Sequence, residues 1–223
     1  MAYGFDFAPV WDYAAMLGRG LVLTVELTAG AAVCGIAIGI AGAAARTSHN
    51  KGWRALAATY VEAIRNTPFL VQLFFIFFGI ASLGVRFSAW QAAMMAMIVN
   101  LGAYATEIIR AGIEATPHGQ IEAAESLGLS RFETFRYVVL KPAMRRIWPA
   151  LSSQVIIVML GSAVCSQIAA EELTFAANYI ESRTFRAFEV YFVATGLYLG
   201  LAVLLRWALR EAGRLLFLPR AHG

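Results

Sequence analysis

The amino-acid sequence predicts an all-α integral membrane protein with five transmembrane helices, its N-terminus outside and its C-terminus in the cytoplasm. Composition supports this, because 60% of the 223 residues are hydrophobic and 14% are charged, against about a quarter charged in soluble domains. The distribution of charge also supports it, because five long stretches contain no Asp, Glu, Lys or Arg. These stretches are Leu27–Ala45, Asn66–Val85, Phe87–Thr106, Ile147–Ala170 and Val190–Leu205.

Each uncharged stretch approaches the length of a membrane-spanning helix. Such a helix needs about 20 apolar residues to cross roughly 30 Å of hydrocarbon, where backbone groups must hydrogen-bond to one another. The first stretch extends back past Glu26, and the last takes in Ala187 and Phe188 and so carries Glu189. We therefore expect spans at about 20–45, 60–83, 87–112, 147–170 and 187–208, within one transmembrane domain of residues 1–223.

The positions of the positive residues set the orientation of these spans. With the N-terminus outside, fourteen of the eighteen Lys and Arg residues, Arg220 among them, fall on the cytoplasmic side. The other four are Arg19, Arg86, Arg183 and Arg186. Because no Lys or Arg precedes Arg19, we expect no cleaved signal peptide. The net charge of +4 thus indicates topology and contact with anionic membrane lipid, and it is no sign of nucleic-acid binding.

The longest polar connection, residues 113–146, joins the third and fourth expected spans. Thr116 and Pro117 are typical of a helix start, with threonine as the N-cap and proline in the first turn. Gly128 suits the left-handed conformation that follows many helix ends. We therefore expect a short helix from Pro117 to Leu127, about 16 Å long at about 1.5 Å per residue.

A second short helix is expected directly after this turn. Ser130 and Glu133 have the S-x-x-E spacing of a capping box. The residues of its expected apolar face, which would pack on the membrane helices, are Phe132, Phe135, Val138 and Val139. Pro142 then ends or kinks this helix. A solvated connection is the alternative reading, but the capped ends and the length of the segment argue against it.

The residues of this loop and its neighbours resemble those of a known family. The run "EAAESLG" (122–128), followed by "VVLKPAMRRIWPAL" (138–151), resembles the EAA loop in the membrane subunits of bacterial ABC importers. The runs "RNTPFLVQLFFIFFG" (65–79) and "NLGAYATEIIRAGIEATPHGQIEAAESLGLSRFETFRYVVL" (100–140) are similar to the polar amino acid permeases in particular. The resemblance covers nearly the whole chain.

This resemblance implies a type I ABC importer-like fold and a permease subunit in the bacterial inner membrane. In that family the loop helix docks into a cleft on a separate ATP-binding subunit. The residues to which the resemblance gives this ATPase-coupling role are Glu122, Ala123, Ala124 and Gly128. It also implies a dimer of ATP-binding subunits, a second permease subunit in a homo- or heterodimer, and a periplasmic amino-acid-binding protein.

The sequence itself lacks the pattern of an ATPase. A phosphate-binding P-loop ends in Gly-Lys-Ser/Thr, but the two lysines, Lys51 and Lys141, follow Asn50 and Leu140. The three histidines have no metal-ligand spacing, and no Ser/His, Asp/Asp or His/Glu set has a catalytic spacing. We therefore expect no enzyme activity and no cofactor in this chain, with ATP used by the partner subunit.

Polar residues inside the expected spans are candidates for a substrate path, because such residues are costly in a membrane. The selected residues are Gln72, Asn100, Tyr104, Ser162, Ser166 and Gln167, with Gln154 beside them. Asn100 and Tyr104 share a helical face, as do Ser162 and Ser166. Each residue taken alone also fits an ordinary interhelical hydrogen bond.

Other intramembrane features indicate packing rather than transport. Glu107 and Arg110, three residues apart at the end of the third span, are expected to pair. The patterns Gly35-x-x-x-Gly39 and Gly196-x-x-x-Gly200 are typical of close helix packing. The alternative function is a passive membrane channel or scaffold subunit without ATP coupling, which has no use for a capped loop helix.

Overall fold

The computed structural model describes residues 4–217, without the side chains of Arg131 and Phe217. Arg220, one of the fourteen positive residues assigned to the cytoplasmic side, lies outside these residues. Within them the regular structure is entirely helical, which confirms the predicted all-α class. Four helices are long and apolar enough to cross a membrane, and a bent helix pair makes a fifth candidate.

Helix α2 (Ala14–Arg46) packs along α6 (Ala89–Glu114), and a short helix α1 (Ala8–Trp11) precedes it. A Cβ atom placed on Gly39 would lie 2.5 Å from the Ala105 Cβ, and one on Gly35 would lie 2.9 Å from the Leu101 Cβ. Only glycine permits this approach of the two backbones, so the expected close packing at Gly35-x-x-x-Gly39 is confirmed.

The second expected span is not one straight helix. Its elements are α3 (Lys51–Arg65), α4 (Phe69–Phe74), the π-helical η1 (Phe75–Gly79) and α5 (Ile80–Ser82). The two arms, Lys51–Arg65 and Phe69–Ser82, meet at 109°, so the expectation of a continuous helix over 60–83 is wrong. The reason is Pro68, which is extended (φ −63°, ψ 139°), lacks an N–H, and disfavours helical geometry in the residue before it.

The second loop helix continues into the fourth span without interruption. The elements in this part are α7 (His118–Ser126), α8 (Arg131–Glu133), the π-helical η2 (Thr134–Leu140), α9 (Lys141–Gly161) and the 3₁₀ segment η3 (Ser162–Ile168). Of the two expected alternatives at Pro142, an end or a kink, the structure excludes an end. Pro142 lies in the first turn of α9, directly after the π-helical segment, where the regular α-helical hydrogen-bond ladder is already interrupted.

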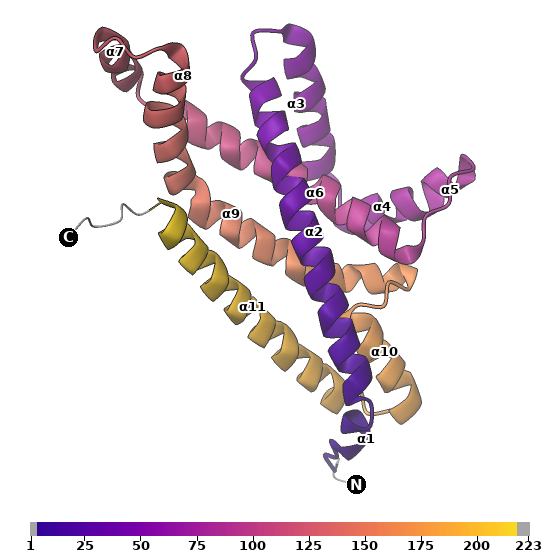
Figure 1. Cartoon of the computed structure of the whole chain (residues 1–223). Coiled ribbons are helices and arrows are strands. Elements are labelled where there is room, and N and C mark those ends of the chain that lie inside the picture. The colour runs from indigo at the N-terminus through magenta and orange to yellow at the C-terminus, as the bar shows by residue number, and fades with distance from the viewer. Residues whose placement is uncertain (1–3, 218–223) are drawn as a thin grey trace, which may run out of the picture.

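A helix that the sequence did not reveal, α10 (Leu173–Thr184), precedes the last helix, α11 (Ala187–Phe217). The Glu172 carboxylate caps α10 by accepting from the Phe175 N–H at 2.8 Å. The Leu173 N–H donates to Thr24 Oγ1 at 3.2 Å, which fixes the start of α10 against α2. In Figure 1, α1 and α10 lie at one end of the molecule, and α7, α8 and the α2–α3 turn lie at the opposite end.

Candidate functional site

The short helix α7 ends in a tight turn at Gly128, as expected. Gly128 has φ +80°, in the left-handed region. The Leu129 N–H donates to the Ala124 carbonyl at 3.1 Å, and the Gly128 N–H donates to the Glu125 carbonyl at 3.0 Å. These two hydrogen bonds make a Schellman motif, which closes the helix end and reverses the chain direction.

The start of α7 differs from the expected cap. Pro117 occupies the N-cap position itself, with φ −60° and ψ 134°, and no side chain caps the helix. The Thr116 Oγ1 is buried and has no hydrogen-bond partner among the described residues. The expected threonine N-cap is therefore wrong, because the proline stands one position earlier relative to the helix than assumed.

Most of the α7 surface is free of contacts with the rest of the chain. Ala124 is buried and faces the helix that follows, which fixes the side on which α7 rests. Glu122 and Ala123 are exposed, and Leu127 at the corner is 80% exposed. This face of α7 is therefore accessible to another molecule.

The segment after α7 has the expected cap but not the expected apolar face. The Ser130 N–H and Oγ–H donate to Glu133 Oε2 at 2.9 and 2.6 Å, and these hydrogen bonds lower the pKa of the Glu133 carboxyl. Val139 is buried, but Phe132 and Phe135 are 69% and 45% exposed. The π-helical turns that begin at Thr134 hold more residues per turn than an α-helix, so the i, i+3, i+4 spacing no longer gives one face.

The loop is fixed to two spans at its ends. The Arg146 guanidinium of α9 donates to the Ala115 carbonyl, at the end of α6, at 3.1 Å. This carbonyl follows the last turn of α6, where carbonyl groups lack partners within the helix. The α7 helix is thus held between α6 and α9 with little free chain on either side.

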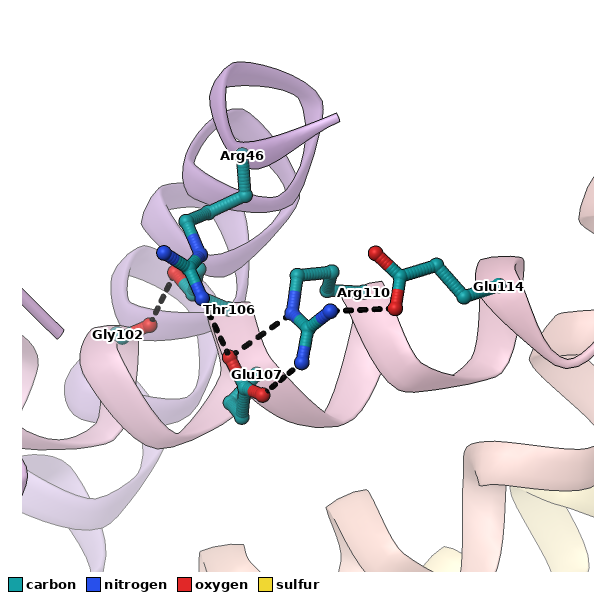
Figure 2. A network of polar contacts seen from close by, with 6 residues as sticks. All are labelled: Arg46, Gly102, Thr106, Glu107, Arg110 and Glu114. Carbon is teal, nitrogen blue, oxygen red and sulfur yellow. Dashed lines mark hydrogen bonds and ion pairs between the residues drawn. The ribbon is translucent and has the colours of Figure 1, made fainter. Parts of the chain in front are cut away.

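A chain of ion pairs links the same end of α6 to α2 (Figure 2). The Arg110 Nε donates to Glu107 Oε2 at 3.1 Å, and a second nitrogen of this guanidinium donates to Glu107 Oε1. The Arg46 Nη2, at the end of α2, lies 3.8 Å from Glu107 Oε2. Arg110 also pairs with Glu114, the last residue of α6. The expected pairing of Glu107 with Arg110 is confirmed, and Arg46 extends it to a second helix.

A cavity of about 490 Å³ lies between the broken second span, α6 and α9. Its lining residues are Thr67, Pro68, Phe69, Asn100, Tyr104, Gln154, Ile157, Val158, Gly161 and Val164. Asn100 and Tyr104, which share a face of α6, and Gln154 of α9 thus contribute amide and hydroxyl groups to one largely apolar space. A few polar groups in an apolar cavity are typical of small-molecule sites.

Gln72 contacts Asn100, one of the residues that line this cavity, and stabilises the break in the second span. Its Nε2 donates to the carbonyls of Ile64 and Thr67 at 2.7 and 3.0 Å, and to Thr67 Oγ1 at 3.0 Å. Its Oε1 accepts from Asn100 Nδ2 at 3.0 Å. Gln72 is 7% exposed, so its main role is to satisfy carbonyl groups that the break leaves without helical partners.

Charged residues that the sequence did not single out lie beside Tyr104. A second cavity of about 220 Å³ is lined by Val61, Glu62, Arg65, Asn66 and Tyr104. The Arg65 guanidinium lies 5.4 Å from the centre of the Tyr104 ring, a cation–π distance. The signal that points to Arg65 is its place directly before the Asn66–Pro68 break.

The structure places the other predicted path residues elsewhere. Ser162 and Ser166 donate to the carbonyls of Met159 and Ala163 in their own segment, at 2.7 and 2.8 Å. Gln167 is exposed, and none of the three lines the cavity at Asn100. No group of three or more His, Cys, Asp or Glu within residues 4–217 has the arrangement of a metal site.

Known proteins share both the sequence and the fold. The sequence profile of the family described as "Binding-protein-dependent transport system inner membrane component" matches residues 35–212. The chain is 35% identical over 214 residues to the glutamine transport system permease protein GlnP of Escherichia coli (strain K12), across 94% of this chain and 97% of that protein. It is 34% identical over 222 residues to the octopine transport system permease protein OccM of Rhizobium radiobacter, across 92% and 90%.

The fold matches solved structures of transporters. A crystal structure of an amino acid ABC transporter with histidines superposes with a TM-score of 0.88 at 36% identity, across 95% of this chain and 99% of that one. An inward-facing structure of the MetNI methionine ABC transporter superposes with a TM-score of 0.75, across 92% and 98%. At 21% identity, the second match indicates a shared fold alone.

Proposed function

Because the chain belongs to the family of binding-protein-dependent transport system inner membrane components, we propose that it is the permease subunit of an importer of polar amino acids that a separate ATPase drives. The proteins that it resembles along nearly their whole length are named as glutamine and octopine permeases. The shared family gives the permease role and the inner-membrane location. The substrate class and the coupling to ATP go further and rest on the geometry of this chain.

The observation that carries the proposal is the placement of α7. This helix exposes Glu122, Ala123 and Leu127, and it is closed by the left-handed turn at Gly128. It is attached directly to α6 on one side and to the continuous helix through η2 and α9 on the other. A helix held in this way transmits a push from a partner to two membrane spans, whereas a simple connector has no need of such an exposed surface.

The ion pairs at Glu107 extend this route to a third helix. Movement of α7 displaces the end of α6, and the Glu107 carboxylate, shared between Arg110 and Arg46, carries that displacement to the end of α2. Closure of two ATP-binding subunits on the α7 helices of two permease copies would thus tilt the spans. The cavity would then open alternately to the two sides of the membrane.

The two adjoining cavities support a zwitterionic, polar substrate. Glu62 and Arg65 supply opposite charges that match the ammonium and carboxylate groups common to all amino acids. Asn100 and Gln154 supply amide groups that match a polar side chain. The substrate passes between these groups, and a periplasmic binding protein delivers it to the end that carries α1 and α10.

This function requires other subunits. A dimer of ATP-binding subunits contacts α7 and hydrolyses ATP, because this chain has no P-loop sequence. A second permease subunit completes the path, since the spans of one copy do not enclose the cavity. The N-terminus lies outside and the C-terminus in the cytoplasm, in accord with the fourteen-to-four distribution of positive residues.

Substitution of Gly128 by valine tests the coupling role of α7. Valine resists the φ of +80° required at this position, so the turn would open while the membrane helices stay packed. We expect the permease to insert and fold but to lose co-purification with the ATP-binding subunit, together with most of the ATPase stimulation by binding protein and substrate in vesicles. Gly119→Ala, on the first turn of the same helix with open space around its Cβ position, is the matched control.

Two outcomes separate the candidate functions. Full ATPase stimulation in the Gly128→Val variant would show that the loop only connects two spans. This result would favour the passive channel or scaffold. Substrate flux through reconstituted permease alone, without ATP and the ATP-binding subunit, would also favour a channel.

A further inference from the structure

A second large cavity, distinct from the one at Asn100, opens between α9 and α11. Its volume is about 430 Å³, and four arginines line it. Arg145 comes from the first turns of α9, and Arg206, Arg210 and Arg214 come from α11. The three α11 arginines are spaced by four residues, so they lie on one face of the helix at intervals of about 6 Å.

Three of these four arginines have no carboxylate partner within the described chain. Arg214 pairs with Glu211, with 2.7 Å between Nη1 and Oε1. No carboxylate between residues 4 and 217 lies within ion-pair distance of Arg145, Arg206 or Arg210. Three uncompensated guanidinium groups around one cavity repel one another, and a bound anion would relieve this repulsion.

The floor of the cavity is apolar and firmly built. The Trp148 Nε1–H donates to the Leu209 carbonyl at 2.8 Å, which fixes the indole across α11. Gly213 makes this possible, since a Cβ atom there would lie 2.3 Å from Trp148 Nε1. Pro149 and Ile156 extend the apolar surface along α9. The Oγ of Ser152, which also lines the cavity, is buried without a hydrogen-bond partner in the described chain.

The depth of the cavity matches the boundary between hydrocarbon and headgroups. Arg206 is the first charged residue after the uncharged stretch Val190–Leu205, and Arg210 and Arg214 continue beyond it. In Figure 1 this end of α11 lies toward the end of the molecule that carries α7. Anionic lipids are attracted to basic residues at the cytoplasmic surface of a membrane. An anion free in solution would not need the apolar floor that leads from the arginines toward Ile156.

We propose that this cavity binds a phospholipid with an anionic headgroup in the leaflet next to the ATP-binding subunits. Arg206, Arg210 and Arg145 bind the phosphate, and the Ser152 hydroxyl is a further donor to the headgroup. One acyl chain lies along Trp148, Pro149 and Ile156. The proposal rests on the proposed function for the side of the membrane and for the ATP-binding partner, but it does not depend on the transported solute. Loss of lipid preference is measured without transport, so its failure is distinguishable from a failure of the proposed function.

The test measures which lipid stays with the purified permease–ATPase complex. The complex is placed in nanodiscs of phosphatidylcholine with a minor share of phosphatidylglycerol, extracted again, and analysed by native mass spectrometry for retained lipid. We expect wild type to retain phosphatidylglycerol preferentially. The Arg206→Gln/Arg210→Gln variant should lose this preference roughly tenfold, which corresponds to about 1.4 kcal/mol. The matched control is Lys51→Gln/Arg54→Gln, which removes two exposed charges from α3 and should retain the preference.

The remaining outcomes distinguish an anionic lipid from a soluble anion or a second permease copy as the occupant of the cavity. Unchanged retention in the double arginine variant overturns the proposal, and the single Arg210→Gln variant serves if the double variant does not assemble. Retention of phosphatidylglycerol no better than phosphatidylcholine, together with bound inorganic phosphate in the wild-type complex, identifies a site for soluble anions and overturns the lipid assignment. A disulfide between two permease copies, formed through a cysteine at Ser153, shows that a second copy covers the cavity and also overturns it.

Discussion

Glu172 shows how much a single residue holds together at the end of the molecule that carries α1. Its carboxylate has no exposed surface and accepts from the Phe175 N–H and from the Tyr198 hydroxyl, at 2.8 and 2.5 Å. The same hydroxyl lies 2.8 Å from Thr174 Oγ1, so one carboxylate joins the start of α10 to α11. Burial raises the pKa of Glu172 despite these hydrogen bonds, because the charged form loses its hydration.

This raised pKa predicts a pH dependence of stability. The folded state holds the Glu172 proton more tightly than the unfolded state does. The protonated carboxyl therefore stabilises the fold fully at pH values below the pKa that Glu172 has in the unfolded state. This stabilisation is lost as the pH rises through the pKa that Glu172 has in the folded state. Glu172→Gln cannot ionise and should escape this loss. We expect the difference in thermal midpoint between Glu172→Gln and wild type to increase as the pH rises from the unfolded-state pKa of Glu172 to its folded-state pKa. Parallel curves for Glu172→Gln and wild type would contradict the prediction.

At the scale of helices, one carboxylate joins the end of α2 to the end of α6, beyond the glycine contacts along their length. Glu107 and its two arginine partners are each about one-fifth exposed, so removing the ion pairs should change the free energy of unfolding by only about 1 kcal/mol. Glu107→Gln should therefore give a folded subunit in which the end of α2 at Arg46 is no longer tied to the end of α6. We expect substrate transported per ATP hydrolysed to fall several-fold in reconstituted vesicles. Glu114→Gln, at a half-exposed partner of Arg110 alone, is the control, and equal coupling in both variants would exclude this route.

Local chemistry explains which elements the sequence predicts well. The turn at Gly128 and the Ser130–Glu133 capping box depend on residues three or four positions apart, so their pattern is visible in the sequence. The Gly35–Gly39 pair is similarly visible, because few other roles favour two glycines at this spacing in a span. Counts of apolar residues, by contrast, carry no information on the direction of a helix axis. They therefore do not predict the 109° break in the second span, although Pro68 lies at that break.

Helix type and non-local contacts explain the remaining errors. The prediction of a shared face for Ser162 and Ser166 assumes an α-helix, but their segment is 3₁₀, with three residues per turn. Asn100 and Tyr104 were assigned correctly to one face because α6 is regular. Helix α10 has mixed polarity and only twelve residues, and its position depends on Thr24, far away in the sequence.

At the scale of the whole molecule, one copy of the chain leaves packing surfaces without partners. Cβ atoms placed on Gly196 and Gly200 would meet nothing within 4 Å, so the close packing expected at this pair is not made inside the described chain. Leu199 and Val203, near them on α11, are exposed. Lipid or a second permease subunit therefore covers this face of α11.

The orientation of the molecule is testable by cysteine labelling. In a background with Cys34→Ala and Cys165→Ala, single cysteines at His49 and Glu125 should react only with reagents that enter the cytoplasm. A cysteine at Ser182, exposed near the end of α10, should react from outside in intact cells. These positions are exposed and distant from the proposed substrate cavity. Labelling of Glu125→Cys by an impermeant reagent would reverse the orientation and place α7 on the wrong side for an ATPase.

The π-helical segment Thr134–Leu140 has a consequence for the type of motion that α7 can cause. Its hydrogen bonds run from i to i+5, so its seven residues form a shorter and wider segment than the same residues would in an α-helix. A change from π to α hydrogen-bond register lengthens the segment and rotates α8 about its axis relative to α9. Displacement of α7 would then reach the fourth span with axial and rotational components in addition to tilt.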